Sequence, residues 1–262
     1  MPNRTVFLMY HELQVAGRAP IRDDPGYLRY VIDEKEFRAQ LIQLRIDGFC
    51  GTSVGDWLSS RREEPQVVIT FDDGCETDFL TAGPLLVEIV FKATFFVVSG
   101  FVGKTGFMTE KQIRHLHNLG FEIGCHSMTH AYLTDLDPTL LRVEVLEAKQ
   151  KLEQILGNAV NHFSCPGGRF NRQVIRMAHE VGYQTVSTSR ICANGKNADW
   201  FRLGRVALQR GTSIIAFQRI CHAKGLLRRQ LQDRLLSTAK GLLGNSVYEK
   251  TRSFVLGKAR RS

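Results

Sequence analysis

Short apolar segments alternate with amphipathic segments along most of this chain, and that alternation limits the folds open to it. Runs such as Thr5–Tyr10, Gln66–Phe71 and Ala93–Val98 are apolar or β-branched at nearly every position. Strands of this composition are buried on both faces, which is typical of parallel sheets covered by helices. Because these runs alternate with helical patterns, the sequence predicts an α/β fold with a parallel sheet.

About seven strand–helix units fit into the chain, which favours a barrel or distorted barrel over a small open sheet. Further strands are expected at residues 121–124, 162–164 and 183–187, and helices at 34–47, 84–91, 110–118, 138–156 and 172–181. In such folds the chemistry lies at the C-terminal ends of the strands. Polar residues directly after a strand are therefore the first candidates for a functional site.

The net charge of +9 comes entirely from the end of the chain. Residues 1–216 contain 24 basic and 24 acidic residues, whereas residues 217–262 contain 11 basic and two acidic ones, an excess of nine. Apolar residues recur at three- and four-residue steps from Ile214 to Leu242, which predicts a basic amphipathic helix. We therefore expect a barrel domain over residues 1–213 and a helical C-terminal extension over residues 214–262.

The apolar face of this extension has two possible uses. It could pack against the barrel, or it could dock on the anionic inner leaflet of a membrane as a peripheral contact. A nucleic-acid partner is not expected, because the extension has few aromatic residues and the barrel carries no basic excess.

The remaining composition predicts a cytoplasmic protein, free or peripheral on the inner membrane. The apolar run at residues 6–10 is too short for the core of a signal peptide. No apolar run approaches the roughly 20 residues of a membrane-spanning helix. The six cysteines lie far apart and form no Cys-x-x-Cys pair, which favours unpaired core residues in a reducing compartment.

Two adjacent carboxylates, Asp72 and Asp73, follow the apolar strand at residues 66–71, and Gly74 comes next. Carboxylates at the end of a buried strand are costly unless a cation or a reaction uses them. An ordinary Asp-Asp-Gly turn is the alternative.

A second polar cluster favours the functional interpretation. His126 and His130 follow the strand at residues 121–124, and their spacing puts both imidazoles on one side of a turn. Two histidines and one carboxylate form a ligand set that leaves positions open on a catalytic divalent metal. One of the two aspartates can then bind the metal, and the other can act as a general base.

Residues 70–74 (TFDDG) and 126–130 (HSMTH) resemble the first two motifs of the polysaccharide deacetylases, the NodB-homology enzymes of carbohydrate esterase family 4. The resemblance extends over roughly residues 5–210 and includes residues 93–97 (ATFFV) and 152–157 (LEQILG). It implies a distorted (β/α)7-type barrel, the NodB-like glycoside hydrolase/deacetylase fold.

The resemblance also implies roles for single residues. Asp73, His126 and His130 would bind the metal, Asp72 would be the catalytic base, and Ser127 would orient the second histidine or its loop. Zinc is the expected metal, and Co2+, Ni2+ or Fe2+ also suit this ligand set.

Residues 163–169 (FSCPGGR) depart from the third family motif, in which an arginine, two prolines, a tyrosine and a glycine follow a phenylalanine. Ser164 replaces the arginine. Gly167 replaces the tyrosine, whose backbone N–H contacts the oxyanion in the family, and a glycine offers the same donor. We expect Pro166, Gly167 and Arg205 on the oxyanion or substrate side.

The missing arginine normally steadies the catalytic base, so another residue must do this. Arg205 and Arg169 are the two candidates. For each of them, an ordinary arginine at the surface or the edge of the core is the alternative.

The family's usual C-terminal catalytic histidine is not visible, because His222 lies in the basic extension. Residues 8–11 (LMYH) instead place His11 at the end of the first strand, as in a subgroup of these enzymes involved in exopolysaccharide synthesis. First and last strands are neighbours in a closed barrel, so this shift keeps the histidine in the site. His11 is our candidate general acid for the leaving amine, and a structural histidine is the alternative.

We therefore predict a metal-dependent hydrolase that removes N-acetyl groups from an amino-sugar unit of a polysaccharide or a lipid-linked glycan. One alternative is a deformylase or amidase of the same fold that acts on another amide. The other is a barrel that binds glycan or metal without turnover, given the missing arginine. The presence of Asp72, Asp73, His126 and His130 argues against this last alternative.

Overall fold

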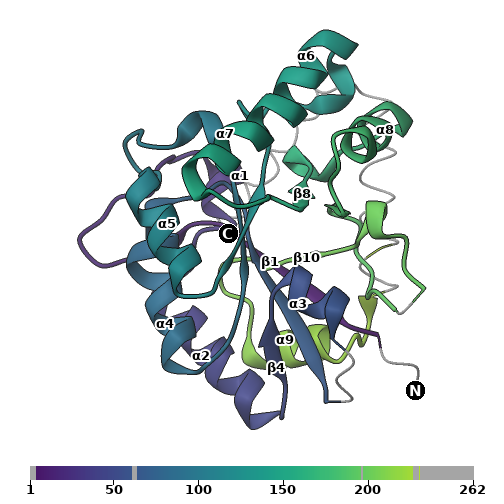
Figure 1. Cartoon of the computed structure of the whole chain (residues 1–262). Coiled ribbons are helices and arrows are strands. Elements are labelled where there is room, and N and C mark those ends of the chain that lie inside the picture. Colours follow the sequence, from purple (N-terminus) through teal and green to yellow (C-terminus); the bar gives the residue numbers. More distant parts are fainter. Residues whose placement is uncertain (1–3, 61–63, 196, 227–229, 231–262) are drawn as a thin grey trace.

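The computed structural model describes residues 4–60, 64–195, 197–226 and 230 (Figure 1). Its centre is a curled parallel sheet with the strand order β10–β1–β5–β6–β7–β8–β9, and β4 pairs with the first half of β5. The strands are β1 (Val6–Tyr10), β4 (Cys50–Thr52), β5 (Gln66–Phe71), β6 (Thr94–Val97), β7 (Glu122–Cys125), β8 (His162–Ser164), β9 (Thr185–Ser187) and β10 (Val206–Ala207).

Helices surround this sheet, most of them on its outer face (Figure 1). They are α1 (Pro25–Leu28), α2 (Glu34–Ile46), α3 (Val54–Ser59), α4 (Gly83–Glu88), α5 (Glu110–Asn118), α6 (Pro138–Arg142), α7 (Ala148–Leu156), α8 (Arg172–Glu180) and α9 (Ile214–Cys221). A small parallel pair, β2 (Leu13–Gln14) and β3 (Ile32–Asp33), lies in the segment after β1. The strands predicted from the sequence and most of the predicted helices are present, with small shifts at their ends.

One predicted helix differs from the structure. Residues 138–156 do not form a single α-helix, because the π-helical turn η4 (Val143–Glu147) separates α6 from α7. Such wider turns often mark functional sites, since they change the direction in which side chains point. Gly157 ends α7, in a left-handed conformation with φ of 69°.

The two edges of the sheet meet through residues 203–207. Leu203 bridges to Ser187 of β9, and Val206 pairs with Leu8 of β1. The first and last strands are therefore neighbours, and the predicted distorted barrel is confirmed.

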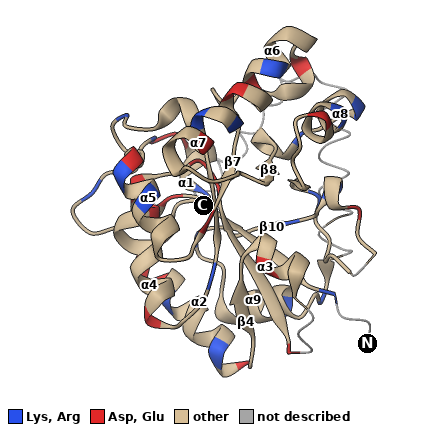
Figure 2. Ribbon diagram, viewed as in Figure 1, with Lys and Arg blue, Asp and Glu red and all other residues tan. Residues whose placement is uncertain are grey.

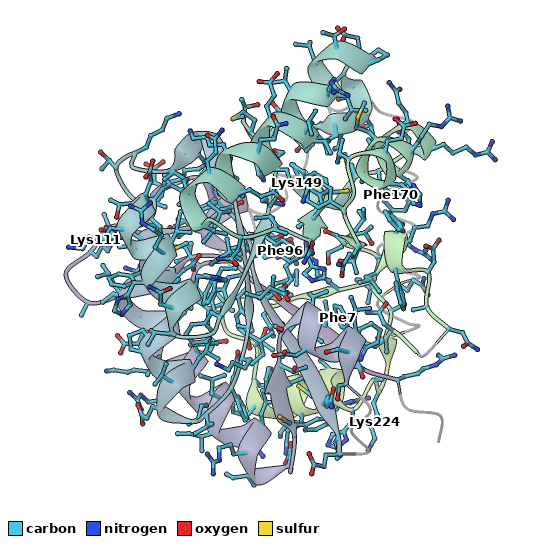
Figure 3. The ribbon with its side chains drawn as sticks, viewed as in Figure 1. Phe7, Phe96, Lys111, Lys149, Phe170 and Lys224 are labelled. Atoms are coloured by element: carbon cyan, nitrogen blue, oxygen red, sulfur yellow. The ribbon has the colours of Figure 1, made fainter. Side chains whose placement is uncertain are left out.

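The core has two layers that alternate along each strand, because successive side chains of a strand point to opposite faces. In β5, Ile69 and Phe71 pack in the outer layer between sheet and helices, whereas Val68 packs inside the barrel with Phe7 and Phe96. Figure 3 shows these two phenylalanines pointing into the middle of the molecule. The site described below depends on this alternation.

Helix α3 closes the barrel at the end where the strands begin. The backbone N–H groups of Val54 and Gly55 donate to the side chains of Thr94 and Glu122, the first residues of β6 and β7. The ring of Trp57 packs edge-on against Phe7 at 4.9 Å. The opposite end, where the strands finish, is left for the polar residues.

The start of the predicted extension packs on the barrel. Phe217 and Ile220 of α9 are buried, and Gln218 donates to Asp47 at the end of α2. The helix ends at Cys221, and Ala223 follows with a left-handed φ of 56°, so the expected continuous helix is interrupted here. Residues 227–229 and 231–262 lie outside the described residues, and the domain boundary at 213/214 stays a prediction.

Charges are interspersed over the outer helices (Figure 2), in keeping with the balanced composition of residues 1–216. In the part of the chain that the structure describes, no helix has the length and apolar character needed to cross a bilayer. Four of the six cysteines, namely Cys75, Cys125, Cys165 and Cys221, are buried.

Replacing Phe96 with alanine should lower the free energy of unfolding by about 3–5 kcal/mol, because it empties the centre of the barrel interior. Ile215→Ala is a suitable control, since that side chain is 72% exposed and its loss should stay within about 0.5 kcal/mol. Urea unfolding of both variants measures the difference. Equal stability of the two variants would contradict the packing described here.

Candidate active site

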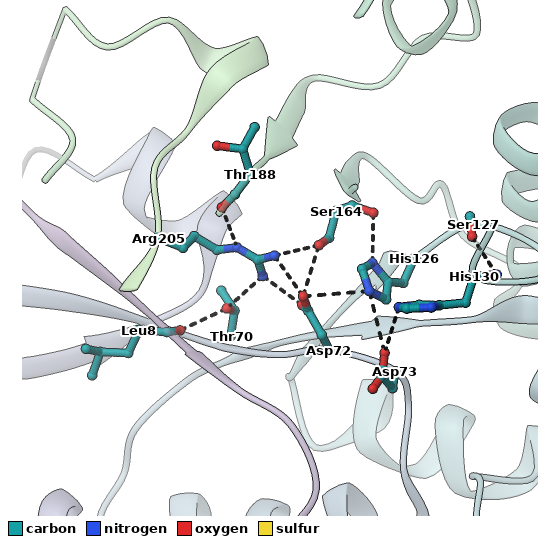
Figure 4. Close-up of polar contacts among 10 residues, drawn as sticks. All are labelled: Leu8, Thr70, Asp72, Asp73, His126, Ser127, His130, Ser164, Thr188 and Arg205. Carbon is teal, nitrogen blue, oxygen red and sulfur yellow. Dashed lines mark hydrogen bonds and ion pairs between the residues drawn. The ribbon is translucent and has the colours of Figure 1, made fainter. Parts of the chain in front are cut away.

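Three strands each place a polar side chain in the barrel mouth, through the alternation of inward and outward positions. Tyr10 and Phe71 pack in the outer layer, so His11 and Asp72, which follow them, point inward. His126 follows the outward-facing Cys125 in the same way. The pairing of Tyr10 with Phe71 brings the ends of β1 and β5 side by side. Figure 4 shows Asp72 and His126 of this cluster with their polar contacts.

Three side chains of this cluster converge on one point. Oδ1 of Asp73 lies 3.6 Å from Nε2 of His126 and 3.4 Å from Nε2 of His130. This buried oxygen has no hydrogen-bond partner among the described residues. The three ligand atoms lie within 4.8 Å of one another, close enough to bind a single metal ion.

The state of His126 suits a metal ligand. Its Nδ1 lies 2.8 Å from the carbonyl oxygen of Ser164, which can only accept a hydrogen bond, so Nδ1 carries the proton and Nε2 keeps a free lone pair. Burial lowers the pKa of His126 to about 4, although the nearby Asp72 opposes this. The ring is therefore neutral near pH 7, and the chemistry of the donor set fits a divalent metal.

Asp72 is held by a buried ion pair with Arg205. Nη1 and Nη2 of Arg205 each donate to one carboxylate oxygen at 2.7 Å, and the arginine side chain is fully buried. Burial is the largest single influence and raises the pKa of Asp72, but the charges of Arg205, His126 and His11 and the hydrogen bonds from Arg205 together outweigh it and hold that pKa well below its usual range. Asp72 is thus an ionised acceptor at any pH near neutrality.

Arg205 has no donor left for substrate. Its remaining N–H groups donate to Oγ1 of Thr70, Oγ of Ser164 and the carbonyl oxygen of Thr188 (Figure 4). These bonds and the two to Asp72 use all five donors of a guanidinium group. Of the two roles predicted for Arg205, the structure favours steadying the base over contact with the substrate.

Arg169, the other candidate for steadying the base, has a different position. Its guanidinium lies 3.9 Å from the centre of the ring of Tyr132, and Tyr132 is two residues after His130 in the sequence. The same ring packs on Gly167, where an added Cβ would lie 2.8 Å from Cε1 of Tyr132. Gly167 is exposed at the mouth and adopts a left-handed φ of 61°, and Pro166 before it is buried.

His11 lies beside the ion pair, because the Asp72 N–H donates to the carbonyl oxygen of Tyr10, the residue directly before His11, at 2.9 Å. The His11 ring is partly exposed and faces the Tyr30 ring, with centroids 5.3 Å apart. Its Nδ1 is buried and has no partner among the described residues. The ring is thus available for a contact that the protein itself does not make.

The loop that carries both histidines contains contacts that sequence reasoning found only in part. Oγ of Ser127, the residue that we expect to orient the second histidine or its loop, accepts from the N–H of His130 at 3.1 Å. Glu144, which we did not predict, accepts from the backbone of Met128 and Thr129. Glu144 lies three residues after the buried Leu141, on the apolar face of the predicted helix at residues 138–156. A carboxylate at such a position was the sequence signal that Glu144 has a buried polar role.

Comparison with known sequences identifies relatives of this chain. The pattern that defines the family described as "Polysaccharide deacetylase" matches residues 59–186. YxkH of Bacillus subtilis, assigned to the polysaccharide deacetylases, is 27% identical over 221 residues, which cover 82% of this chain and 75% of that protein. Peptidoglycan-N-acetylglucosamine deacetylase of Bacillus cereus is 32% identical over 124 residues, 47% of this chain and 56% of that protein.

Solved structures share the fold. The Streptococcus pyogenes deacetylase PplD, in complex with acetate, superposes with a TM-score of 0.75 at 21% identity, over 84% of this chain and 99% of that one. IcaB from Ammonifex degensii superposes with a TM-score of 0.70 at 22% identity, over 84% of this chain and 96% of that one.

Replacing Arg205 with methionine should lower the free energy of unfolding at pH 7 by about 3–5 kcal/mol, because it leaves a buried carboxylate unpaired. The loss should shrink as the pH falls, since burial raises the pKa of an unpaired Asp72 and protonation then removes its charge. Adding Asp72→Asn should recover part of the loss. Arg169→Met is the control, with an expected loss below about 1 kcal/mol.

Denaturant unfolding at pH 7 and pH 5 provides these values. Similar losses for the Arg205 and Arg169 variants, or a double variant no more stable than Arg205→Met, would contradict the buried pair.

Proposed function

This chain belongs to the polysaccharide deacetylase family, hydrolases that act on carbon–nitrogen bonds, and we propose that it removes N-acetyl groups from an amino-sugar unit with the help of a divalent metal. One observation carries this proposal. Asp73, His126 and His130 converge on a single point, directly beside an ionised Asp72.

The metal would be held by Asp73, His126 and His130, with zinc expected and Co2+, Ni2+ or Fe2+ also suited to the set. When bound, such an ion polarises a carbonyl and lowers the pKa of water. The chain's own contribution is a neutral imidazole at His126 and an Asp73 carboxylate oxygen that has no hydrogen-bond partner among the described residues.

Asp72 is the proposed general base. Its ion pair with Arg205 keeps it ionised and oriented toward the mouth, 3.7 Å from Nε2 of His126. A carboxylate fixed in this way can take a proton from a water that attacks the acetyl carbon. The oxygen that becomes negative would accept from the backbone N–H of Gly167.

His11 is the proposed general acid for the leaving nitrogen. It enters the mouth from β1, next to β5, and therefore flanks Asp72 on the side away from β7. Its ring is partly exposed, and its Nδ1 has no hydrogen-bond partner in the part of the chain that the structure describes; both observations support this role. Departure of the amine needs a proton, and a histidine is suited to deliver it near neutral pH.

The substrate is proposed to be an N-acetylated glycan, either a polysaccharide or a sugar on a lipid carrier. The relatives named as peptidoglycan and chitooligosaccharide deacetylases support the glycan class. A cytoplasmic location, with the basic extension touching the inner membrane, would suit a lipid-linked substrate and stays a prediction.

Alanine at Asp73, His126 or His130 should abolish metal binding and acetate release together, because three ligands leave little redundancy. Asp72→Asn should keep the metal and lose turnover, since it changes only the base. Elemental analysis and acetate release from N-acetylated oligosaccharides measure both quantities. A metal-free Asp72→Asn together with a metal-containing Asp73→Asn would reverse the two roles.

His11→Ala should keep the metal and the fold and lower kcat by roughly 10²–10⁴-fold, the usual effect of removing a general acid. An activated acetate ester should restore much of the rate, since its leaving group departs without a proton. If the variant is equally impaired on the ester and on the amide, relative to the wild type, His11 is not the acid.

A further inference from the structure

The loop between the two histidines has a conformation that its residues do not favour by themselves. Ser127 and His130 both have left-handed backbones, with φ of 69° and 62°. Residues other than glycine adopt this region only in a small minority of cases. Other parts of the protein must therefore hold the loop in place.

Glu144 makes the contacts that hold it. One carboxylate oxygen accepts from the N–H groups of Met128 and Thr129, at 3.0 and 2.9 Å, and the other accepts from Oγ1 of Thr129 at 2.5 Å. The three donors all lie between the two histidines. Glu144 is 6% exposed, so these hydrogen bonds are shielded from competing water and stronger for it.

The π-helical turn η4 accounts for the direction in which Glu144 points. Glu144 lies in this turn between α6 and α7, and its neighbours Leu141 and Val145 are buried in the core. The hydroxyl of Tyr183 donates to the carbonyl of Val145 at 3.1 Å, which anchors the turn. The carboxylate is thus fixed to a rigid part of the barrel.

The two histidines differ in their need for such support. His126 directly follows β7 and is 2% exposed, with its ring tied to the backbone of Ser164. The His130 side chain is 35% exposed and lies on the loop. Nε2 of His130 therefore stays near Oδ1 of Asp73 only if the conformation of the loop is fixed.

We propose that Glu144 is a positioning residue of the metal site, which presets His130 for the ion by fixing the loop at Met128 and Thr129. This inference rests on the proposed function, because it assumes that Asp73, His126 and His130 bind a metal. Without Glu144, the ion would have to order the loop as it binds, and its affinity would fall. Lost support behind a metal ligand typically lowers affinity by about 10–100-fold.

Charge and position can be separated at this residue. Glutamine at position 144 can accept both backbone N–H groups through its oxygen and donate its amide to Oγ1 of Thr129, without a negative charge. Methionine has a similar length and accepts none of these bonds. If Glu144 acts by position, glutamine preserves the site and methionine does not.

The experiment measures the dissociation constant of Zn2+ by competition with a chromophoric chelator, on the full chain freed of metal. Glu144→Met should weaken zinc binding by about 10–100-fold, whereas Glu144→Gln should stay within about threefold of wild type, since a neutral acceptor retains most of each bond. Glu147→Met, at an exposed position of the same turn, is the matched control and should bind zinc like the wild type.

Unfolding of the metal-free variants separates positioning from general stability. Reduced stability of Glu144→Met with unchanged zinc affinity would overturn the proposal. If that variant does not fold, Thr129→Val, at an exposed position, removes one of the three bonds and should weaken zinc binding by about threefold. An unchanged constant there would also overturn the proposal. A wild-type chain without zinc affinity, or an Asp73→Ala variant that binds zinc normally, would instead overturn the proposed function.

Discussion

The buried ion pair between Arg205 and Asp72 is the interaction on which the mouth of the barrel depends. An unpaired carboxylate at this depth would be strongly unfavourable. Arg205 compensates the charge of Asp72 and donates two hydrogen bonds of 2.7 Å to it. The same guanidinium binds Thr70, Ser164 and Thr188, so it joins the ends of β5, β8 and β9. It enters from the segment just before β10, which also joins the two edges of the sheet. The arginine that connects these strands thus keeps Asp72 ionised as well.

Much of the fold could be predicted from the sequence, because burial on both faces leaves a clear signature in short strands. Residues 66–71 and 162–164 begin and end where their apolar pattern predicts. The same periodicity places part of the site, since a residue directly after an outward-facing strand end must point inward. His11, Asp72 and His126 all follow this rule. Asp73 and His130 do not follow from this rule, and the family resemblance is what predicted them as metal ligands.

The remaining features depend on contacts between distant parts of the chain. Arg205 and Asp72 are 133 positions apart. No local sequence pattern shows that Arg205, and not Arg169, forms the ion pair with Asp72. Ser164 replaces the arginine of the family motif, and only the structure shows that its small side chain lies within hydrogen-bonding distance of that guanidinium. The π-helical turn at Val143–Glu147 breaks a helical pattern that looks continuous in sequence. Its consequence, a carboxylate directed at the histidine loop, could not be predicted from spacing alone.

The central claim is that one metal ion at Asp73, His126 and His130 enables removal of acetyl groups from a glycan. Titration of zinc into the metal-free wild-type chain, followed by acetate release from an N-acetylated oligosaccharide, tests it most directly. The account predicts no release before zinc is added and a linear rise that levels off at one equivalent per chain. Full activity in the metal-free protein, or no acetate release at any metal content, would contradict it.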